Sequence, residues 1–165
     1  MHNRILSHQQ IQYTIERIAY QIYETNVDEK ELVIAGIEGG GLKFAQKIVA
    51  VLEKITAAKI VLCKVRMNKK DPLDSGVSTS LAEQDYANKS VVLVDDVLNS
   101  GTTLIYGVHH FLQTPLKQLK TAVLVNRNHK KYPVKADFKG ISLSTSLQEH
   151  ITVEFRSRND GVYLD

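Results

Sequence analysis

Two acids and a run of small hydroxyl residues lie close together in the middle of the chain. Asp95 and Asp96 follow an apolar run at residues 91–94, which is typical of a strand buried on both faces. Apolar residues at helical spacing come later, so a helix is expected to begin inside the intervening loop. That loop reads Asn99-Ser100-Gly101-Thr102-Thr103.

This combination of residues predicts a site for a phosphorylated sugar. Backbone amides and the dipole at a helix N-terminus favour an anion. Gly101 lets the backbone approach a ligand, and the neighbouring hydroxyls add hydrogen-bond donors. The two acids would accept hydrogen bonds from sugar hydroxyls or hold a divalent metal. A plainer interpretation stays open, in which the strand ends in a solvated acidic turn and Ser100 is an ordinary N-cap.

The composition sets the class of protein. The 165 residues suit one domain, and a hydrophobic content of 43% is enough for a core. We expect no membrane span, because no run of about 18 apolar residues occurs, and the first ten residues lack the apolar centre of a signal peptide, which favours the cytoplasm. The single cysteine, Cys63, is expected to be buried. The net charge of +3 is compatible with phosphorylated substrates and is no strong argument for nucleic acid.

Helix and strand patterns alternate along the chain, which predicts an α/β domain with a central, mainly parallel sheet and helices on both faces. A first helix is expected over residues 5 to about 25, with Ser7 and Gln10 as a capping box. Further strands are expected at 31–37, 59–67 and 118–125. The face of the first helix that should be buried carries Ile11, Ile15, Ile18, Ala19 and Ile22.

A second strand-loop-helix turn follows the strand at 31–37. Its loop reads Glu38-Gly39-Gly40-Gly41, and a helix is expected over 42–53. Backbone amides at such a turn can bind an anion, although no basic residue occurs before Lys43. A tight turn without a ligand is the alternative explanation of the glycines.

Two later stretches are poor in regular pattern. Residues 68–88 are polar and long for a loop, which predicts a lid or a disordered segment in which Lys69, Lys70 and Asp71 are solvated. Residues 136–144 and 151–164 give short strand signals and are expected to form an antiparallel edge or a small flap.

Residues 91–103 resemble the 5-phosphoribosyl 1-pyrophosphate (PRPP) motif of the type I phosphoribosyltransferase family: four apolar residues, two acids, two apolar residues, then x-Ser/Thr-Gly-x-Thr. Residues 122–146 are similar to the group in this family that combines pyrimidine-operon regulation with uracil phosphoribosyltransferase activity. The segment matches that group's pattern at Arg127, His129 and Pro133. It departs from the pattern at Asn126 and Asn128, where the group has an Asp and a Gly. The resemblance covers nearly the whole chain. It implies one domain over residues 1–165, with a flexible loop at 68–88 and a hood at 127–155.

The resemblance also implies a reaction, in which ribose 5-phosphate moves from PRPP to a nucleobase, most readily uracil, with Mg²⁺ and release of pyrophosphate. Asp95 and Asp96 would hold the ribose hydroxyls and, directly or indirectly, the metal. Residues 99–103 would bind the 5-phosphate, and Glu38, Gly39, Gly40 and Gly41 would form the pyrophosphate loop, here without the family's usual basic residue. The hood residues expected near the base are Arg127, Lys131 and Val134.

Besides a nucleotide-binding protein without a base partner, two other functions stay open. The first is a nucleotide-sensing regulator that binds RNA, for which the sequence offers a lysine-rich stretch, Lys130, Lys131, Lys135 and Lys139. The second is a purine-base phosphoribosyltransferase. Purine-type relatives usually carry Asp at the position of Asn99, and an amide does not titrate, so the chain favours a pyrimidine. A homo-oligomer, dimer or larger, is expected from the resemblance alone.

Overall fold

A computed structural model describes residues 3–165, so the first two residues of the predicted domain lie outside the described part of the chain. The helices are α1 (His8–Glu24), α2 (Gly40–Ile55), α3 (Glu83–Tyr86) and α4 (Thr102–Leu112). The strands are β1 (Asn3–Leu6), β2 (Glu31–Ile37), β3 (Lys59–Arg66), β4 (Ser78–Thr79), β5 (Ser90–Leu98), β6 (Gln118–Arg127), β7 (Phe138–Leu143), β8 (Ile151–Glu154) and β9 (Gly161–Leu164).

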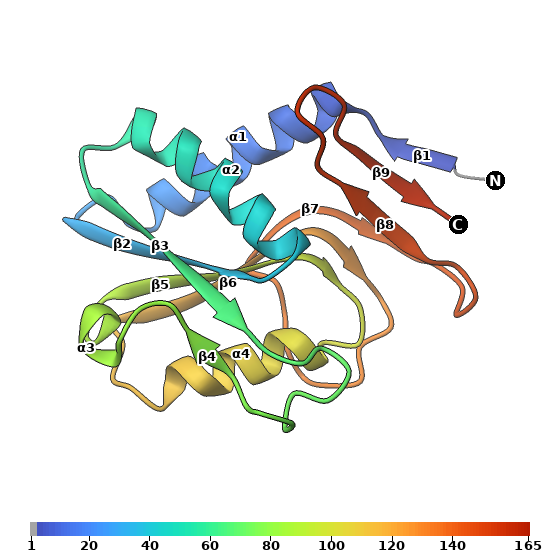
Figure 1. The fold of residues 1–165 in the computed structure, drawn as a ribbon. Helices are drawn as coiled ribbons and strands as arrows, with labels where there is room; N and C mark the ends of the chain where they lie inside the picture. Colours follow the sequence, from blue (N-terminus) through green and yellow to red (C-terminus); the bar gives the residue numbers. More distant parts are fainter. Residues whose placement is uncertain (1–2) are drawn as a thin grey trace.

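Six strands form the main sheet, in the order β4-β3-β2-β5-β6-β7 (Figure 1). All neighbours pair in parallel except β4, which joins β3 antiparallel. The chain adds β3 on one side of β2 and then returns to place β5 on the other side. Ligands of open α/β sheets bind at such a switch point, outside the carboxyl ends of the strands. The topology therefore brings together the loop after β2 and the loop after β5.

Helices cover both faces of this sheet, as the sequence predicts. α1 and α2 lie on one face, and α3 and α4 lie on the other (Figure 1). The capping box between Ser7 and Gln10 is present at the start of α1. Phe44 of α2 and Phe111 of α4 are fully buried on opposite sides of the sheet. The predicted inner face of α1 is buried in full: Ile11, Ile15, Ile18, Ala19 and Ile22.

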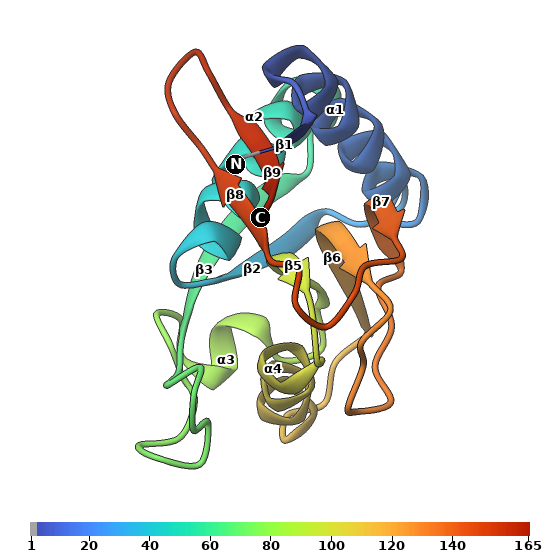
Figure 2. The same cartoon turned by 90° about the vertical axis from the view of Figure 1, so that its right-hand side faces the viewer.

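The N-terminus differs from the prediction of a helix from residue 5. Residues 3–6 form β1, and α1 begins only after Ser7 caps it. β1 pairs antiparallel with β9, which pairs antiparallel with β8. We call this three-stranded unit the hood sheet; it stands beside the end of the main sheet (Figure 2). A pairing between the two ends of the chain leaves no local pattern, so the sequence could not indicate it.

The segment 136–144 also differs from its prediction as an antiparallel edge or flap. It contains β7, which pairs in parallel with β6 and completes the main sheet, with Ala122 opposite Phe138 and Arg127 opposite Leu143. The prediction of antiparallel strands is confirmed further on, where β8 and β9 pair. The part of the predicted hood that lies apart from the main sheet therefore comes after β7.

Part of the predicted lid is anchored. Residues 68–88 contain β4 and the short α3, and Tyr86 is buried with its ring 5.0 Å from that of Phe111 in an edge-to-face contact. Cys63 on β3 is buried, as predicted. Within residues 3–165, the structure contains no helix with the length and apolar character that crossing a membrane requires.

Candidate functional site

Asp95 and Asp96, which we call the acid pair, lie where β5 extends beyond the end of its pairing with β2. Pairing between β2 and β5 ends at Gly36 and Val94, whereas β5 continues beside β6 as far as Leu98. The strand therefore runs through both acids, which were predicted to stand at its C-terminal end, and continues to Leu98. Successive side chains on a strand point to opposite faces. Accordingly, Asp95 lines a cavity of about 340 Å³ with the loop after β5, and Asp96 lines a second cavity of about 370 Å³ with the end of β8.

Asp95 is a buried carboxylic acid, with only 5% of the residue exposed. Burial raises its pKa to about 8, and the negative charge of Asp96 adds to the rise, while the ammonium of Lys69 opposes it. One Asp95 oxygen accepts a hydrogen bond of 2.9 Å from the Asp96 amide. A cation at this position would favour the ionised form.

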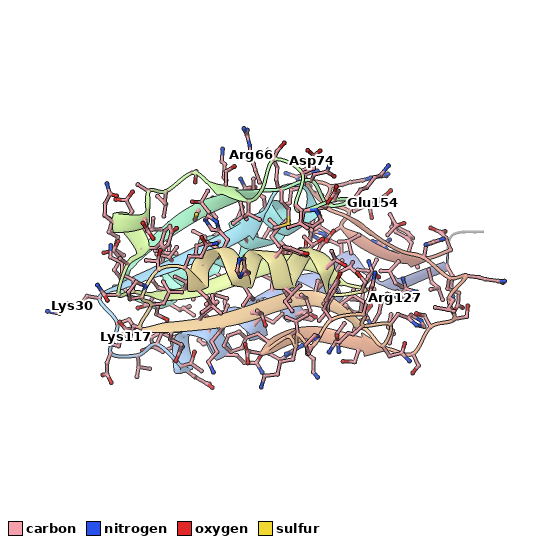
Figure 3. The ribbon with its side chains drawn as sticks, turned by 90° about the horizontal axis from the view of Figure 1, so that it is seen from below. Lys30, Arg66, Asp74, Lys117, Arg127 and Glu154 are labelled. Carbon is pink, nitrogen blue, oxygen red and sulfur yellow. The ribbon has the colours of Figure 1, made fainter. Side chains whose placement is uncertain are left out.

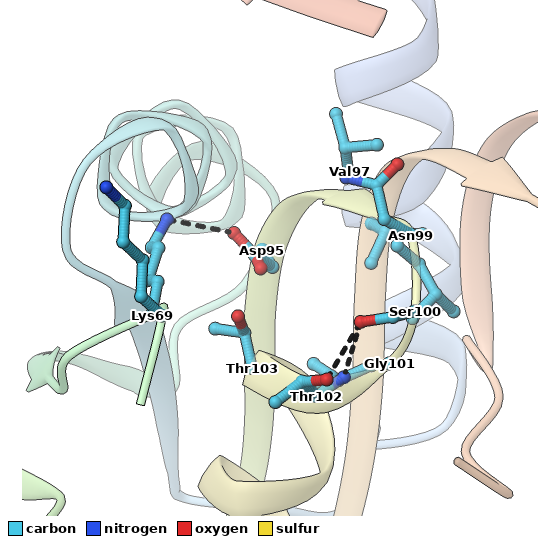
Figure 4. A pocket seen from close by; sticks show the side chains of 12 residues that line it. Lys69, Asp95, Val97, Asn99, Ser100, Gly101, Thr102 and Thr103 are labelled. Atoms are coloured by element: carbon cyan, nitrogen blue, oxygen red, sulfur yellow. Dashed lines mark hydrogen bonds and ion pairs between the residues drawn. The ribbon is translucent and has the colours of Figure 1, made fainter. Parts of the chain in front are cut away.

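The loop Asn99–Thr103, which we call the phosphate loop, lines the first cavity and leads into α4 (Figure 4). Gly101 is the N-cap, with a φ of +85°, a left-handed conformation that glycine adopts without strain. Ser100 is therefore not the N-cap, although its hydroxyl lies 2.8 Å from that of Thr102 and accepts a 3.3 Å hydrogen bond from the Thr102 amide. The first amides of a helix have no intrahelical partners, so this end can receive an anion.

The loop of residues 38–41, which we call the glycine loop, lies against the acid pair. Gly39 caps α2 with a φ of +98°, and α2 begins at Gly40, two residues earlier than predicted. A Cβ added at Gly40 would overlap the Asp96 carboxylate, and one at Gly41 would lie 2.8 Å from an Asp95 oxygen. These positions need glycine because the N-terminus of α2 packs directly on the acids.

Glu38, the charged residue of the glycine loop, pairs with an arginine on the neighbouring strand. Its carboxylate pairs with Arg66 of β3 at 3.3 Å, and both side chains are more than half exposed. Sequence reasoning did not single out Arg66, because only the parallel pairing of β2 with β3 brings the two residues together. The pair removes one negative charge from the balance around the glycine loop.

Arg127 is a buried connector rather than a free group above the cavity. Its guanidinium donates to Asn99 Oδ1 at 2.9 Å, to Thr145 Oγ1 at 2.9 Å and to the Glu149 carbonyl at 2.7 Å. Arg127 and Glu154 lie at one end of the molecule, opposite Lys30 and Lys117 (Figure 3). The residue holds the phosphate loop to the segment after β7, which is a positioning role.

The other two predicted hood residues lie against the phosphate loop. The amides of Lys131 and Tyr132 both donate to the Ser100 carbonyl, at 2.7 and 3.2 Å. A Cβ added at Gly101 would lie 2.6 Å from a Val134 methyl carbon. The amide of Val134 donates to the Tyr132 carbonyl. These amides are engaged within the protein, so they shape the loop in this structure.

Sequence reasoning missed the hood sheet's contribution to the site. Glu154 and Arg156 line the second cavity together with Asp96, Gly39 and Gly40. The one local signal in the sequence is a short alternation of apolar and polar residues at 151–154. This alternation predicts a strand and does not show which residues elsewhere in the chain lie against it. No cluster of three or more His, Cys, Asp or Glu side chains suited to a metal occurs within residues 3–165.

The fold and the site define an α/β protein in which two helix N-termini lie beside a pair of acids, and comparison with known proteins gives the family. Residues 1–157 match the phosphoribosyl transferase domain family, and the chain belongs to it. The resemblance seen in residues 91–103 is thereby confirmed.

Similar sequences narrow the comparison. The chain is 32% identical over 160 residues to the "Bifunctional protein PyrR" of Clostridium acetobutylicum, covering 93% of this chain and 90% of that one. It is 32% identical over 152 residues to the protein of the same name from Streptococcus pneumoniae, covering 91% and 88%.

Solved structures support the fold. A hypoxanthine-guanine phosphoribosyltransferase of Bacillus anthracis superposes with a TM-score of 0.72 at 20% identity, over 86% of this chain and 83% of that one. The hypoxanthine phosphoribosyltransferase of Trypanosoma cruzi gives 0.76 at 16%, over 97% and 95%. Identities at this level speak for the shared fold alone.

Proposed function

We propose that the protein transfers ribose 5-phosphate from PRPP to a nucleobase, with uracil as the preferred acceptor, and releases pyrophosphate. One observation carries the proposal: the N-terminus of α2 packs against Asp95, and the N-terminus of α4 lines the same cavity as Asp95. PRPP carries an anion at each end of its ribose, and the hydroxyls lie between. Two anion-favouring helix ends with a carboxylate between them match that distribution of charge.

The reaction breaks the bond between ribose C1 and the pyrophosphate oxygen and forms a bond from C1 to a ring nitrogen of the base. Positive charge develops on the ribose ring, so the protein acts by positioning and by electrostatic stabilisation. The phosphate loop holds the 5-phosphate, and Asp95 and Asp96 accept hydrogen bonds from the ribose hydroxyls. No side chain attacks covalently. Residues 68–88 exclude water, which would otherwise hydrolyse the activated sugar.

Mg²⁺ fits the donor set at the acid pair. The ion prefers oxygen ligands and is usually bound by one or two carboxylates together with substrate phosphates. Asp95 and Asp96 supply two carboxyl groups, and a bound cation would favour the ionised form of Asp95, whose burial raises its pKa. When bound, the metal would neutralise the pyrophosphate charge. The two acids would hold it directly or through water.

The preference for uracil rests on the resemblance of residues 122–146 and on Asn99. The Asn99 oxygen accepts from Arg127, and the amide cannot act as a base toward a purine nitrogen. Titration of uracil, hypoxanthine and guanine in the presence of a non-hydrolysable PRPP analogue tests this choice. A purine that binds more tightly than uracil would overturn it.

The transfer itself is tested by pyrophosphate release from PRPP and Mg²⁺ with each base and with none. We expect release that depends on uracil in the wild type and is lost in Asp95→Asn/Asp96→Asn. A conserved circular dichroism spectrum would show that the double variant is folded. Release that ignores every base, or that survives in the folded double variant, would contradict the proposal.

A second candidate function is RNA binding, for which one observation speaks. Lys130, Lys131, Lys135 and Lys139 are all exposed, and they follow the strand that carries Arg127. Exposed lysines contact phosphates without reading sequence. A gel shift at low and moderate salt with pyrimidine-operon leader RNA tests it, and no shift at low salt would exclude it. We further propose a cytoplasmic homo-oligomer, whose mass light scattering would measure.

A further inference from the structure

The helix α4 has no charged residue on the side that faces away from the main sheet. Its eleven residues include no Asp, Glu, Lys or Arg. The buried side is formed by Leu104, Gly107 and Phe111. A helix that lies on the surface of a globular protein normally carries charged and polar residues opposite its buried side. The composition of α4 is therefore that of a helix covered on both sides.

Four residues form the exposed side of α4, which we call the α4 face. Leu112 is 62% exposed, His109 is exposed, and the other two residues are half-buried. Residues three, four and seven positions apart in a helix lie on the same side, so the four side chains form one surface. Figure 2 shows α4 end-on, with no other helix or strand of residues 3–165 beyond it on the side away from the sheet. The α4 face consists of Ile105, Tyr106, His109 and Leu112.

Other exposed leucines do not form such a surface. Leu73 lies between Asp71 and Asp74 in the loop after β3, and Leu147 lies two residues before Glu149 in the loop after β7. Single exposed apolar side chains among charged residues are normal on protein surfaces. A helix face without charge is different, because such a face is typical of the centre of a protein interface, where charged residues are depleted.

The charges near the two ends of α4 favour a second copy of the chain as the partner. Beyond the C-terminal end, Thr114 donates a hydrogen bond to the carboxylate of Glu83, so the acidic helix α3, with the exposed Asp85, lies there. At the N-terminal end, the amide of the exposed Lys131 donates to the Ser100 carbonyl. Two antiparallel α4 helices would bring the acidic end of one copy to the basic end of the other.

We propose that two copies of the protein associate through the α4 face, with their α4 helices antiparallel across a two-fold axis. Such an axis places the middle of a surface against itself, and the α4 face has no carboxylate or ammonium group that would repel its own copy there. The inference rests on the proposed homo-oligomer, to which it gives an interface, and it does not depend on the proposed transfer reaction.

The mass of the protein in solution, measured by light scattering and sedimentation over a series of concentrations, tests the proposal. Leu112→Glu should halve the mass of the wild-type assembly and raise the dissociation constant by at least about tenfold, because the contact would bury a carboxylate from each copy. Leu147→Glu is the matched control, since that leucine is 83% exposed and lies outside the α4 face. Its mass should equal that of the wild type. Circular dichroism should show that both variants are folded.

Chemical cross-linking tests the two-fold arrangement. His109 lies near the middle of the α4 face, so His109→Cys should meet its own copy and be joined to it by a short bismaleimide. Leu147→Cys should remain a single chain under the same conditions. The natural Cys63 is buried, which leaves the introduced thiol as the reactive one.

The outcomes separate two failures. If the wild type forms an oligomer and Leu112→Glu has the same mass, the α4 face is not the interface and the homo-oligomer stands. Equal dissociation of Leu147→Glu, or no cross-link in His109→Cys, would also overturn the proposed contact. A wild type that stays monomeric at every concentration would overturn the homo-oligomer and its interface together, and the α4 face would then serve a different protein. None of these results bears on the proposed transfer, which pyrophosphate release measures.

Discussion

The Arg127 guanidinium donates a 2.9 Å hydrogen bond to the side-chain oxygen of Asn99, the first residue of the phosphate loop. The same guanidinium donates to the Glu149 carbonyl, beyond β7. One buried side chain therefore fixes the loop that is proposed to bind the 5-phosphate and the segment that leads into the hood sheet. A planar guanidinium with five donors in a rigid fork reaches acceptors on several sides, whereas a lysine presents its three donors at a single nitrogen.

Arg127→Met should destabilise the protein and weaken its phosphate site. The change leaves buried oxygen acceptors without donors, and we expect a loss of about 2 kcal/mol or more, or a fall of roughly 4–8 °C in Tm. Ribose 5-phosphate should bind more weakly because Asn99 is released. Arg127→Lys should behave similarly, and Lys130→Ala, an exposed neighbour, should not. Unchanged Tm and affinity in Arg127→Met would refute the connector role.

Asp95 makes stability depend on pH in a defined direction. Its folded-state pKa of about 8 lies above the ordinary value of 3.8. Between these values the folded protein holds a proton that the unfolded chain has released, so the free energy of unfolding falls as pH rises from about 4 to 8. Asp95→Asn does not titrate. In metal-free buffer its Tm should exceed that of the wild type increasingly from pH 5 to pH 8.

The matched control for that series is Asp28→Asn, an exposed carboxylate whose difference from the wild type should stay flat with pH. Parallel Tm curves for Asp95→Asn and the wild type would show that Asp95 is ionised throughout. Adding Mg²⁺ should reduce the difference in Tm between Asp95→Asn and the wild type at pH 8, because a cation stabilises the ionised Asp95 carboxylate.

The contact between Gly40 and Asp96 predicts a strong coupling between these positions. An alanine Cβ at residue 40 would overlap the Asp96 carboxylate, so Gly40→Ala should lower the free energy of unfolding by about 1–3 kcal/mol, despite the usual gain from Gly→Ala in a helix. In an Asp96→Ala background the clash is absent, and the same change should be neutral or stabilising. Urea unfolding of the four proteins measures the coupling, and additive effects would disprove the contact.

The features that could be predicted from the sequence are those set by residues close together in the chain. The bounds of β2, the inner face of α1 and the turn into α4 follow from apolar spacing and capping, which act over a few residues. The pairing of β1 with β9 joins the two ends of the chain and has no local signal. The same holds for Arg66 beside Glu38 and for Arg127 beside Asn99, whose contacts depend on which strands become neighbours.

Asp160 links the hood sheet to the helices and offers the last prediction. It is fully buried in the turn between β8 and β9, where it accepts from Gln12 Nε2 at 2.9 Å and pairs with Lys47 Nζ at 3.3 Å. Asp160→Asn would turn an acceptor into a donor opposite these two donors. We expect a loss of about 2–4 kcal/mol, against no change for the exposed Arg158→Ala. Hydrogen exchange should rise in β8 and β9 while β5 and β6 stay protected, since the hood sheet would open separately. Uniform exchange across both sheets would instead show that the hood sheet and the main sheet unfold together.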